Sequence, residues 1–523
     1  MAAKDILFDI EARKKLFDGA EKVYKAVSAT FGPKGLNITI QRPYGAPQVV
    51  GDGVTVAKEI ELEDQFENLG AELVIEAADR TNQDAGDATT LTVILAYEIV
   101  KEGLKQINNG ENARVFRDEL KEATNKIVEY LKPLAKPVKT KEAMANVATI
   151  SSANLETGKM IAEAFDRVTK DGVVTVDLGN SPETEVEFKE GLTVPSGFIV
   201  PHFVTDPETM KVELENPYIL VTDQSLSGAD EILELLKLVH QDNKTILIIA
   251  NDVTSSALGT LILNKQQGFL KPLAIKAPKK GGEGMLEDIA LATGATFISS
   301  KLGLDIKKTT LENLGKAEKI IADKNETVIL GAKGNEKLLQ GRIKQLRKQI
   351  EDSDSSFEEE KYKERLSRLS GGIAVIYAGG NSDTEIRERR LRIEDAINAT
   401  RAAIEEGIIP GGGVPLFHAR AVLQGTTVGE KILSKILETP IKKLLENAGV
   451  DPHPIIYKLN SGTPNQVYDV VTNKFVDAFA KGVVDPLKVI RLALENAISV
   501  ASSLLTTGAS IIELPKDDPK QTV

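Results

Sequence analysis

The feature of this sequence that most limits its possible folds is a change of pattern in the middle of the chain. The first part repeats apolar side chains at helical spacing, as in residues 11–29 and in the segment after Asp87. From about 190 to 373, strand-like runs such as 217–221 and 246–250 alternate with helices instead. The chain then returns to helical patterns. We therefore predict an α/β domain inserted between two halves of a mostly helical domain.

Shorter patterns predict individual elements of this layout. The expected strands are 37–40 and 373–377, and the expected helices are 229–240 and one near 255–267. Residues 338–369 are highly charged, and their few apolar positions suit a helical hairpin.

The overall composition excludes several classes of function. Lys and Arg number 65 and Asp and Glu number 77, so the net charge is −12, which argues against a protein that binds nucleic acid through a basic face. The chain has no Cys and only 4 His, which leaves no thiol chemistry and little material for a His-rich metal centre. We find no run of about 18 apolar residues that could span a membrane. The first 27 residues are amphipathic and unlike a signal peptide, so we expect a cytoplasmic protein.

One helix start has the character of an anion site. Asp87 directly precedes an apolar-periodic helix and can be its N-cap, with Ala88, Thr89 and Thr90 in the first turn. The free N–H groups of such a turn attract anions, and an Asp there is favourable when a cation such as Mg²⁺ lies between it and a phosphate. The alternative is an ordinary Asp cap without any ligand.

Three glycine-containing turns could bring backbone close to a ligand, although each alone is also an ordinary turn. They are Thr30-Phe31-Gly32-Pro33, Gly51-Asp52-Gly53 and Gly411-Gly412-Gly413. No GxxxxGK[ST] motif occurs, so a P-loop fold is not expected.

The sequence resembles the group I chaperonins, the GroEL type, essentially from end to end. The matching blocks include ATFGPKGLNI, GDGVTVAKEIELEDQFENLGAELV, AGDATT, KAPKKGGEGMLEDIA, LENLGKAEKI, GRIKQLRKQIE, RLSGGIAVIYAGG, RIEDAINATRAAIEEGIIPGGG and VVDPLKV. The resemblance implies a multidomain α+β fold with a mostly helical equatorial domain (1–133 and 407–523), a small intermediate hinge domain (134–189 and 374–406) and an inserted α/β apical domain (190–373).

The resemblance also implies a nucleotide site. ATP would be bound by Thr30, Phe31, Gly32, Pro33, Gly51, Asp87, Ala88, Thr89, Thr90, Leu91, Gly412, Asp469, Val470, Val471 and Asp485. Asp87 would hold Mg²⁺, and Thr30 and Thr90 are the expected place for K⁺. Asp52 and Asp395 match the two carboxylates that serve hydrolysis. Because Asp395 lies in the intermediate segment, we expect it to act only after a domain movement.

Several positions depart from the family pattern. Ala88 stands where the family has Gly, which would crowd the site unless its φ is negative. Gly51 replaces a Lys or Asn, and Asp469-Val470-Val471 replaces Asn-Ala-Ala. The loop 278–284 is shorter than usual, and the C-terminal segment 514–523 has no Gly-Gly-Met repeat. Since Asp52, Asp87 and Asp395 are all retained, we expect ATP hydrolysis to be retained.

Two helices of the α/β segment have more apolar positions than one buried face requires, so they are either fully buried or carry a binding groove. The residues that the resemblance assigns to an apical groove are Phe198, Phe203, Leu233, Leu236, Leu258, Ile262 and Leu263. Such a groove would bind non-native polypeptides and the mobile loop of a GroES-type lid co-chaperonin.

The resemblance thus predicts an ATP-dependent folding chaperonin that assembles as a homo-oligomer, by analogy two stacked seven-membered rings, and encloses clients under the lid. The alternative is a holdase or structural ring with weak or absent ATP hydrolysis, motivated by Gly51 and Ala88. An unrelated small-molecule enzyme has little support, because no catalytic triad or metal-ligand spacing occurs.

Overall fold

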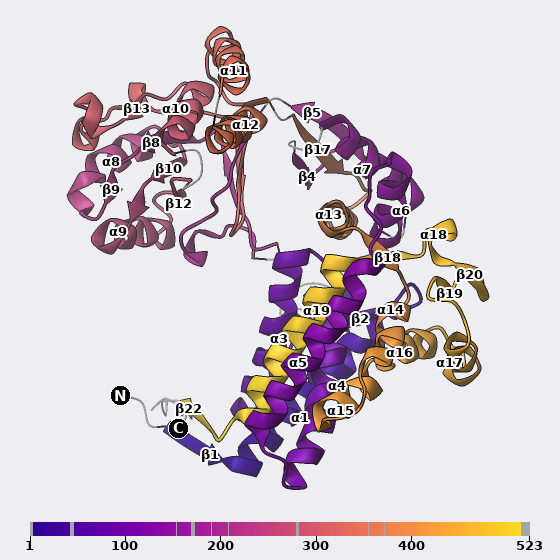
Figure 1. Ribbon diagram of the computed structural model, residues 1–523. Helices are drawn as coiled ribbons and strands as arrows, with labels where there is room; N and C mark the ends of the chain where they lie inside the picture. The colour runs from indigo at the N-terminus through magenta and orange to yellow at the C-terminus, as the bar shows by residue number, and fades with distance from the viewer. Residues whose placement is uncertain are drawn as a thin grey trace. The chain divides into compact units, whose positions relative to one another are not determined.

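The computed structural model shows two compact units, one made of residues 1–162 and 392–523 and one made of residues 163–391 (Figure 1). It describes residues 4–41, 47–152, 154–168, 173–189, 191–207, 209–278, 282–353, 355–370 and 372–513. Residues 279–281 of the shortened loop 278–284 and the C-terminal segment 514–523 lie outside these residues. The insertion of one unit into the other is as predicted, while the finer five-segment division stays a prediction.

The first unit is built on a bundle of long helices that lie side by side in Figure 1. They are α1 (Asp9–Val27), α3 (Gln65–Ala85), α4 (Thr89–Asn108), α5 (Ala113–Leu131) and α19 (Leu487–Thr506). Asp64 and Asn112 cap α3 and α5 through side-chain bonds to backbone N–H groups. By length and composition α19 could cross a membrane, contrary to the expectation from the sequence. Most of its apolar residues are buried against α3, α4 and α5, as in the core helix of a bundle.

Shorter elements of the first unit surround this bundle. The strands form antiparallel pairs: β1 (Lys4–Phe8) with β22 (Ala509–Glu513), β2 (Ile38–Ile40) with β3 (Gln48–Val50), β18 (Ile408–Pro410) with β21 (Val484–Pro486), and β19 (Gln466–Asp469) with β20 (Lys474–Asp477). The helices are α2 (Gly53–Lys58), α6 (Lys141–Ser152), α14 (Val414–Ala419), α15 (Val428–Ile436), α16 (Thr439–Asn447), α17 (Pro452–Asn460) and α18 (Ala478–Lys481). Helices α7 (Leu155–Val168) and α13 (Asp383–Glu406) each run from one unit into the other.

The second unit has an α/β core, as predicted. Its main sheet has parallel strands in the order β12 (Pro272–Lys276), β10 (Ile246–Ala250), β8 (Tyr218–Thr222) and β13 (Phe297–Ile298), with β14 (Gly315–Lys316) antiparallel to β8. Helices α8 (Leu233–Gln241), α9 (Ser255–Gln266) and α10 (Gly282–Thr293) belong to this core. The expected helix 229–240 is split, because residues 229–231 form a 3-10 turn before α8.

Two smaller sheets, and a parallel pair of short strands, β9 (Ser225–Leu226) and β11 (Asp252–Val253), complete the second unit. One is antiparallel, in the order β6 (Gly191–Val194), β16 (Thr327–Leu330), β15 (Lys319–Ala322) and β7 (Val212–Glu215). The other places β17 (Ile373–Ala378) between β4 (Val173–Leu178) and β5 (Glu185–Lys189). The helical hairpin predicted for 338–369 is confirmed as α11 (Glu336–Glu351) and α12 (Ser356–Ser370).

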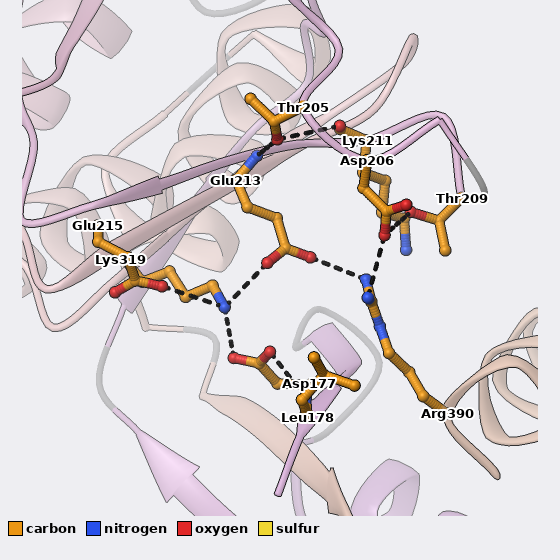
Figure 2. A network of polar contacts seen from close by, with 10 residues as sticks. All are labelled: Asp177, Leu178, Thr205, Asp206, Thr209, Lys211, Glu213, Glu215, Lys319 and Arg390. Atoms are coloured by element: carbon orange, nitrogen blue, oxygen red, sulfur yellow. Dashed lines mark hydrogen bonds and ion pairs between the residues drawn. The ribbon is translucent and has the colours of Figure 1, made fainter. Parts of the chain in front are cut away.

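A network of ion pairs joins these two smaller sheets (Figure 2). Lys319 Nζ on β15 lies 2.5 Å from Asp177 of β4 and 3.1 Å from Glu213 of β7. Arg390 on α13 contacts Glu213 at 2.8 Å and Asp206 at 3.0 Å. Burial would lower the pKa of Lys319, but the charges of Glu213 and Asp177 outweigh that effect and raise it. Glu213 thus links a lysine and an arginine that come from different elements.

Candidate functional site

Four aspartates from separate parts of the first unit are connected by electrostatic interactions. Burial is the largest cause that raises the pKa of Asp87, Asp395 and Asp485; the charge of Asp52 adds to it at Asp87 and Asp395, and the charge of Asp87 adds to it at Asp395 and Asp485. The neighbouring charges that shift these three pKa values are all carboxylates. The structure therefore brings together residues that the sequence placed far apart.

Asp52 is held at the start of α2. Its carboxylate caps the helix by accepting hydrogen bonds from Val54 N at 3.2 Å and from Thr55 N and Oγ1 at 2.8 Å. A side chain on Gly53 would overlap the Thr90 hydroxyl in the first turn of α4. The small size of Gly53 thus lets the N-termini of α2 and α4 meet.

Asp87 is not the N-cap of α4, so that expectation is wrong. The N-cap is Ala88, whose φ of 68° and ψ of 21° are left-handed, and it makes no side-chain cap bond. The Asp87 carboxylate instead accepts a bond from Ala88 N at 2.5 Å. Because the φ of Ala88 is positive, the replacement of the family's Gly is a strained one, which costs roughly 1–2 kcal/mol.

Asp395 reaches Asp87 because α13 packs closely on the preceding loop. Gly86 ends α3 with a φ of 75°, and a Cβ atom on it would overlap the side chain of Asn398. Asn398 lies one turn after Asp395 on the same helix face. Burial, then Asp52 and then Asp87 raise the pKa of Asp395 well above its usual value. On α13, Ile393, Ile397 and Thr400 are buried, while Ile404 is exposed.

Asp485 lies on β21, opposite Ile409 of β18. Burial, and then the charge of Asp87, raise the pKa of Asp485 to about 7, against a lowering by a hydrogen bond from the backbone of Gly412. Gly412 has a φ of 67°, and nothing lies within 4 Å of where its Cβ would be. The backbone of Gly412 therefore has open space on one side and contacts the carboxyl group of Asp485.

The turn that contains Thr30 lies next to the first turn of α4. The Thr30 and Thr90 hydroxyl oxygens are 3.4 Å apart. The Asn447 amide donates to the carbonyls of Ser28 and Phe31, both at 2.9 Å, and fixes the turn before Gly32 and Pro33. No sequence pattern indicated this role of Asn447.

Near Asp87, the buried Thr89 hydroxyl has no hydrogen-bond partner among the described residues. The buried Ser151 hydroxyl makes no hydrogen bond of good geometry there either, but it lies close enough to the Asp87 carboxyl to lower the pKa of Asp87, against the larger effect of burial, which raises it. Ser151 lies in α6 and was not predicted, because an isolated Ser in a helix has no distinguishing pattern. Unpaired hydroxyls beside carboxylates that repel one another suit a ligand that brings both positive charge and hydrogen-bond acceptors.

This arrangement fits a Mg²⁺–nucleotide. In the described part of the chain, no group of three or more His, Cys, Asp or Glu side chains could hold a metal ion unaided. Mg²⁺ commonly binds through one or two carboxylates together with phosphate oxygens and water, so it does not need such a group. The open space at Gly412 and the positive φ of Gly32 (87°) fit a close approach of backbone to phosphates.

The remaining predicted nucleotide residues have varied positions. Leu91 is buried in the core of the bundle, so its side chain cannot contact a ligand. Gly51 is exposed next to Asn37. Val470 is buried in a cluster with Val414, while Val471 is exposed. Burial alone would raise the pKa of Asp469. Hydrogen bonds from Thr472 and Val471, with a smaller effect of the charge of Lys34, outweigh burial and lower this pKa. That effect of Lys34 puts Asp469 near the Gly32-Pro33 turn.

The predicted groove of the second unit is only partly open. Leu233 on α8 and Leu263 on α9 are 40% and 55% exposed. Phe198, Leu258 and Ile262 are partly buried against the core. Leu236 is only 4% exposed and Phe203 is fully buried, so the expectation of an accessible side chain is wrong for these two residues. Leu236 shares the buried face of its helix with Ile232, Leu235 and Val239.

Comparison with known proteins identifies a family, and the similar solved structures include two crystal forms of one chaperonin. The model of the TCP-1/cpn60 chaperonin family matches residues 23–514. Two crystal forms of the chaperonin gp146 from the bacteriophage EL 2 (Pseudomonas aeruginosa), both in the presence of ATP-BeFx, are 21% identical to this chain. Their TM-scores are 0.70 and 0.64, and in each case 98% of this chain and 99% of the other chain are covered. These structures share the fold described above.

Proposed function

Because this chain belongs to the TCP-1/cpn60 chaperonin family, we propose that it is an ATP-hydrolysing chaperonin that binds non-native polypeptides. The observation that carries the proposal is the group of four aspartates, three of which have pKa values raised by burial and further by neighbouring carboxylates, together with the unpaired Thr89 hydroxyl. An unliganded protein gains nothing from such mutual repulsion, whereas a magnesium nucleotide relieves it.

In this proposal the binding residues surround the phosphates. Asp87 holds Mg²⁺, Thr89 and Thr90 bind phosphate oxygens, and the peptides of Gly32 and Gly412 have room for the ligand. Bound Mg-ATP supplies the transferable phosphoryl group with part of its negative charge neutralised. Thr30 and Thr90 together offer hydroxyl oxygens to K⁺.

Asp395 is the residue that receives a proton from the attacking water. Burial, and then the charges of Asp52 and Asp87, raise the pKa of Asp395 well above its usual value. Compensation of those two charges by a magnesium nucleotide would lower this pKa and so favour the carboxylate, which is the form that acts as a general base. Asp52 orients the start of α2 next to Thr90 and lies near Asp395. The proposal includes gating of this step by a movement that takes Asp395 away from the site and returns it, since Asp395 already lies near Asp52 and Asp87 in this structure.

The binding of clients is assigned to the second unit. Leu233 and Leu263 are its accessible apolar side chains on α8 and α9. Partly buried Leu258 and Ile262 lie on α9 as well, so an apolar client segment or the loop of a GroES-type lid can contact several apolar groups. Membership of the family implies ring assembly, and we propose two stacked seven-membered rings in the cytoplasm, without membrane or nucleic-acid partners.

The alternative function is a holdase that binds clients but hydrolyses little ATP, favoured by the strained Ala88 and by Gly51. The test is suppression of aggregation of a chemically unfolded client, followed by addition of Mg-ATP with K⁺. The proposal predicts phosphate release together with release of the client. Stable capture without any phosphate release would instead establish the holdase.

A further inference from the structure

The strained residue Ala88 is held through its carbonyl group by Thr92. The Ala88 carbonyl accepts a bond from Thr92 N at 2.9 Å and lies 3.0 Å from Thr92 Oγ1. Thr92 is fully buried, so its hydroxyl has no access to water. On its other side Ala88 donates its N–H to Asp87. The conformation of Ala88 thus connects a buried hydroxyl in α4 to the Asp87 carboxylate.

A threonine that bonds the carbonyl four residues earlier is common in helices and proves little alone. Thr124 bonds to Leu120 O and Thr400 to Ala396 O in this way, both at 2.7 Å. The acceptor of Thr92 is different, because Ala88 is the left-handed residue before the helix.

Two further side chains from other helices reach the same hydroxyl. Thr92 Oγ1 lies 3.0 Å from Thr81 Oγ1 of α3, and Thr81 is also fully buried. Asn496 of α19 donates its amide N–H to Thr81 Oγ1 at 2.9 Å, and Thr81 Oγ1 lies 3.0 Å from Ala77 O. Thr81 Oγ1 thus accepts from Asn496 and donates to Ala77 O, while the Thr92 hydroxyl lies between two acceptors at 3.0 Å, Thr81 Oγ1 and the Ala88 carbonyl, and its donated hydrogen links the two.

We propose that Asn496, Thr81 and Thr92 are positioning residues that hold Ala88 left-handed and so keep Asp87 and Thr89 in place for the magnesium nucleotide. The ligand in this inference rests on the proposed function, whereas the coupling between Thr92 and Ala88 does not depend on it. A glycine at position 88 adopts a positive φ without strain, so it would not need the network.

The experiment combines Thr92→Val, which keeps the shape but removes the hydroxyl, with Ala88→Gly. The affinity for Mg-ADP is measured by titration calorimetry, and the free energy of unfolding in urea is measured without nucleotide. We expect Thr92→Val to weaken Mg-ADP binding by about fivefold or more in the wild-type background, and by less than about twofold in the Ala88→Gly background. Thr92→Ser should restore binding.

Thr124→Val is the matched control, because it removes a buried hydroxyl that bonds a carbonyl four residues earlier, away from this loop. It should lower stability without changing the Mg-ADP affinity. Asn496→Ala gives a second route if Thr92→Val fails to fold, and its effect should also disappear in the Ala88→Gly background. Equal losses with and without Ala88→Gly would overturn the inference. If the wild type binds no Mg-ADP, the proposed function fails, and the unfolding data still decide whether residues 92 and 88 are coupled.

Discussion

Asn398 packs directly against Gly86, so closely that a Cβ atom on Gly86 would overlap the Asn398 side chain. This contact joins α13 to the loop that carries Asp87. It places Asp395, one turn earlier in α13, beside the aspartates of the bundle. A single glycine therefore controls the approach of the residue that we propose as general base.

Gly86→Ala should disrupt this approach. The substitution introduces strain at a φ of 75° and also a clash with Asn398. Gly449→Ala is a matched control, because its φ is 71° and nothing lies within 4 Å of the added methyl. Both substitutions introduce a conformational strain of roughly 1 kcal/mol, but only Gly86→Ala should also lose ATP hydrolysis. Phosphate release and thermal melting measure the two effects, and similar phosphate release by both variants would argue against this role of the contact.

Asp485 should make stability depend on pH near neutrality. Its folded pKa of about 7 lies above that of an ordinary Asp, so its contribution is complete at low pH and is lost as pH rises through 7. Between pH 5 and 7 the unfolding free energy of the wild type should fall relative to Asp485→Asn by up to about 1.4 kcal/mol per pH unit. Urea unfolding of both proteins at several pH values tests this, and parallel curves would contradict it.

Leu263→Ser and Leu236→Ser should behave differently. Leu263 is 55% exposed, so its replacement should leave the melting temperature nearly unchanged and weaken client capture. Leu236 is in the core, and its replacement should lower stability by about 2–5 kcal/mol. Melting curves and aggregation assays on both variants separate the effects. A large drop in the melting temperature of Leu263→Ser would show that its side chain is structural.

Lys319→Met should destabilise the second unit, because it leaves Asp177 and Glu213 without their shared cation (Figure 2). The loss should be about 3 kcal/mol or more, as for breaking a buried pair, and Asp177→Asn should partly rescue it. Lys333→Met is the control: its pair with Glu318 is exposed and should contribute less than about 1 kcal/mol. Equal effects of both lysine substitutions in urea unfolding would contradict this account of the network.

The periodicity of the sequence was enough to predict the long helices and the core strands. The strands 217–221 and 246–250 are buried on both faces in a parallel sheet and so appear as continuous apolar runs, which made β8 and β10 recognisable. The helical hairpin of α11 and α12 was predicted from its sparse apolar positions at helical spacing. The grouping of Asp52, Asp87 and Asp395 came from the resemblance alone, because no local pattern links distant segments.

The structure differs from the sequence-based expectations in backbone conformation and in side-chain accessibility. Asp87 has the sequence context of an N-cap, but the left-handed Ala88 moves the helix start one residue onward. Leu236 and Leu233 are equally apolar, and their orientation depends on how α8 packs on the sheet. Ser151, Asn447 and Asn398 act through contacts between helices, for which the sequence has no local signal.

The most direct test of the central claim compares Asp395→Asn with Asp87→Asn in Mg-ADP binding and in phosphate release from Mg-ATP. We predict that Asp395→Asn binds Mg-ADP with nearly wild-type affinity while its phosphate release falls by about 10²-fold or more. Asp87→Asn should lose magnesium-dependent binding itself. Undiminished phosphate release by Asp395→Asn, or an equal loss of binding in both variants, would contradict the proposed division between a metal-holding and a water-activating carboxylate.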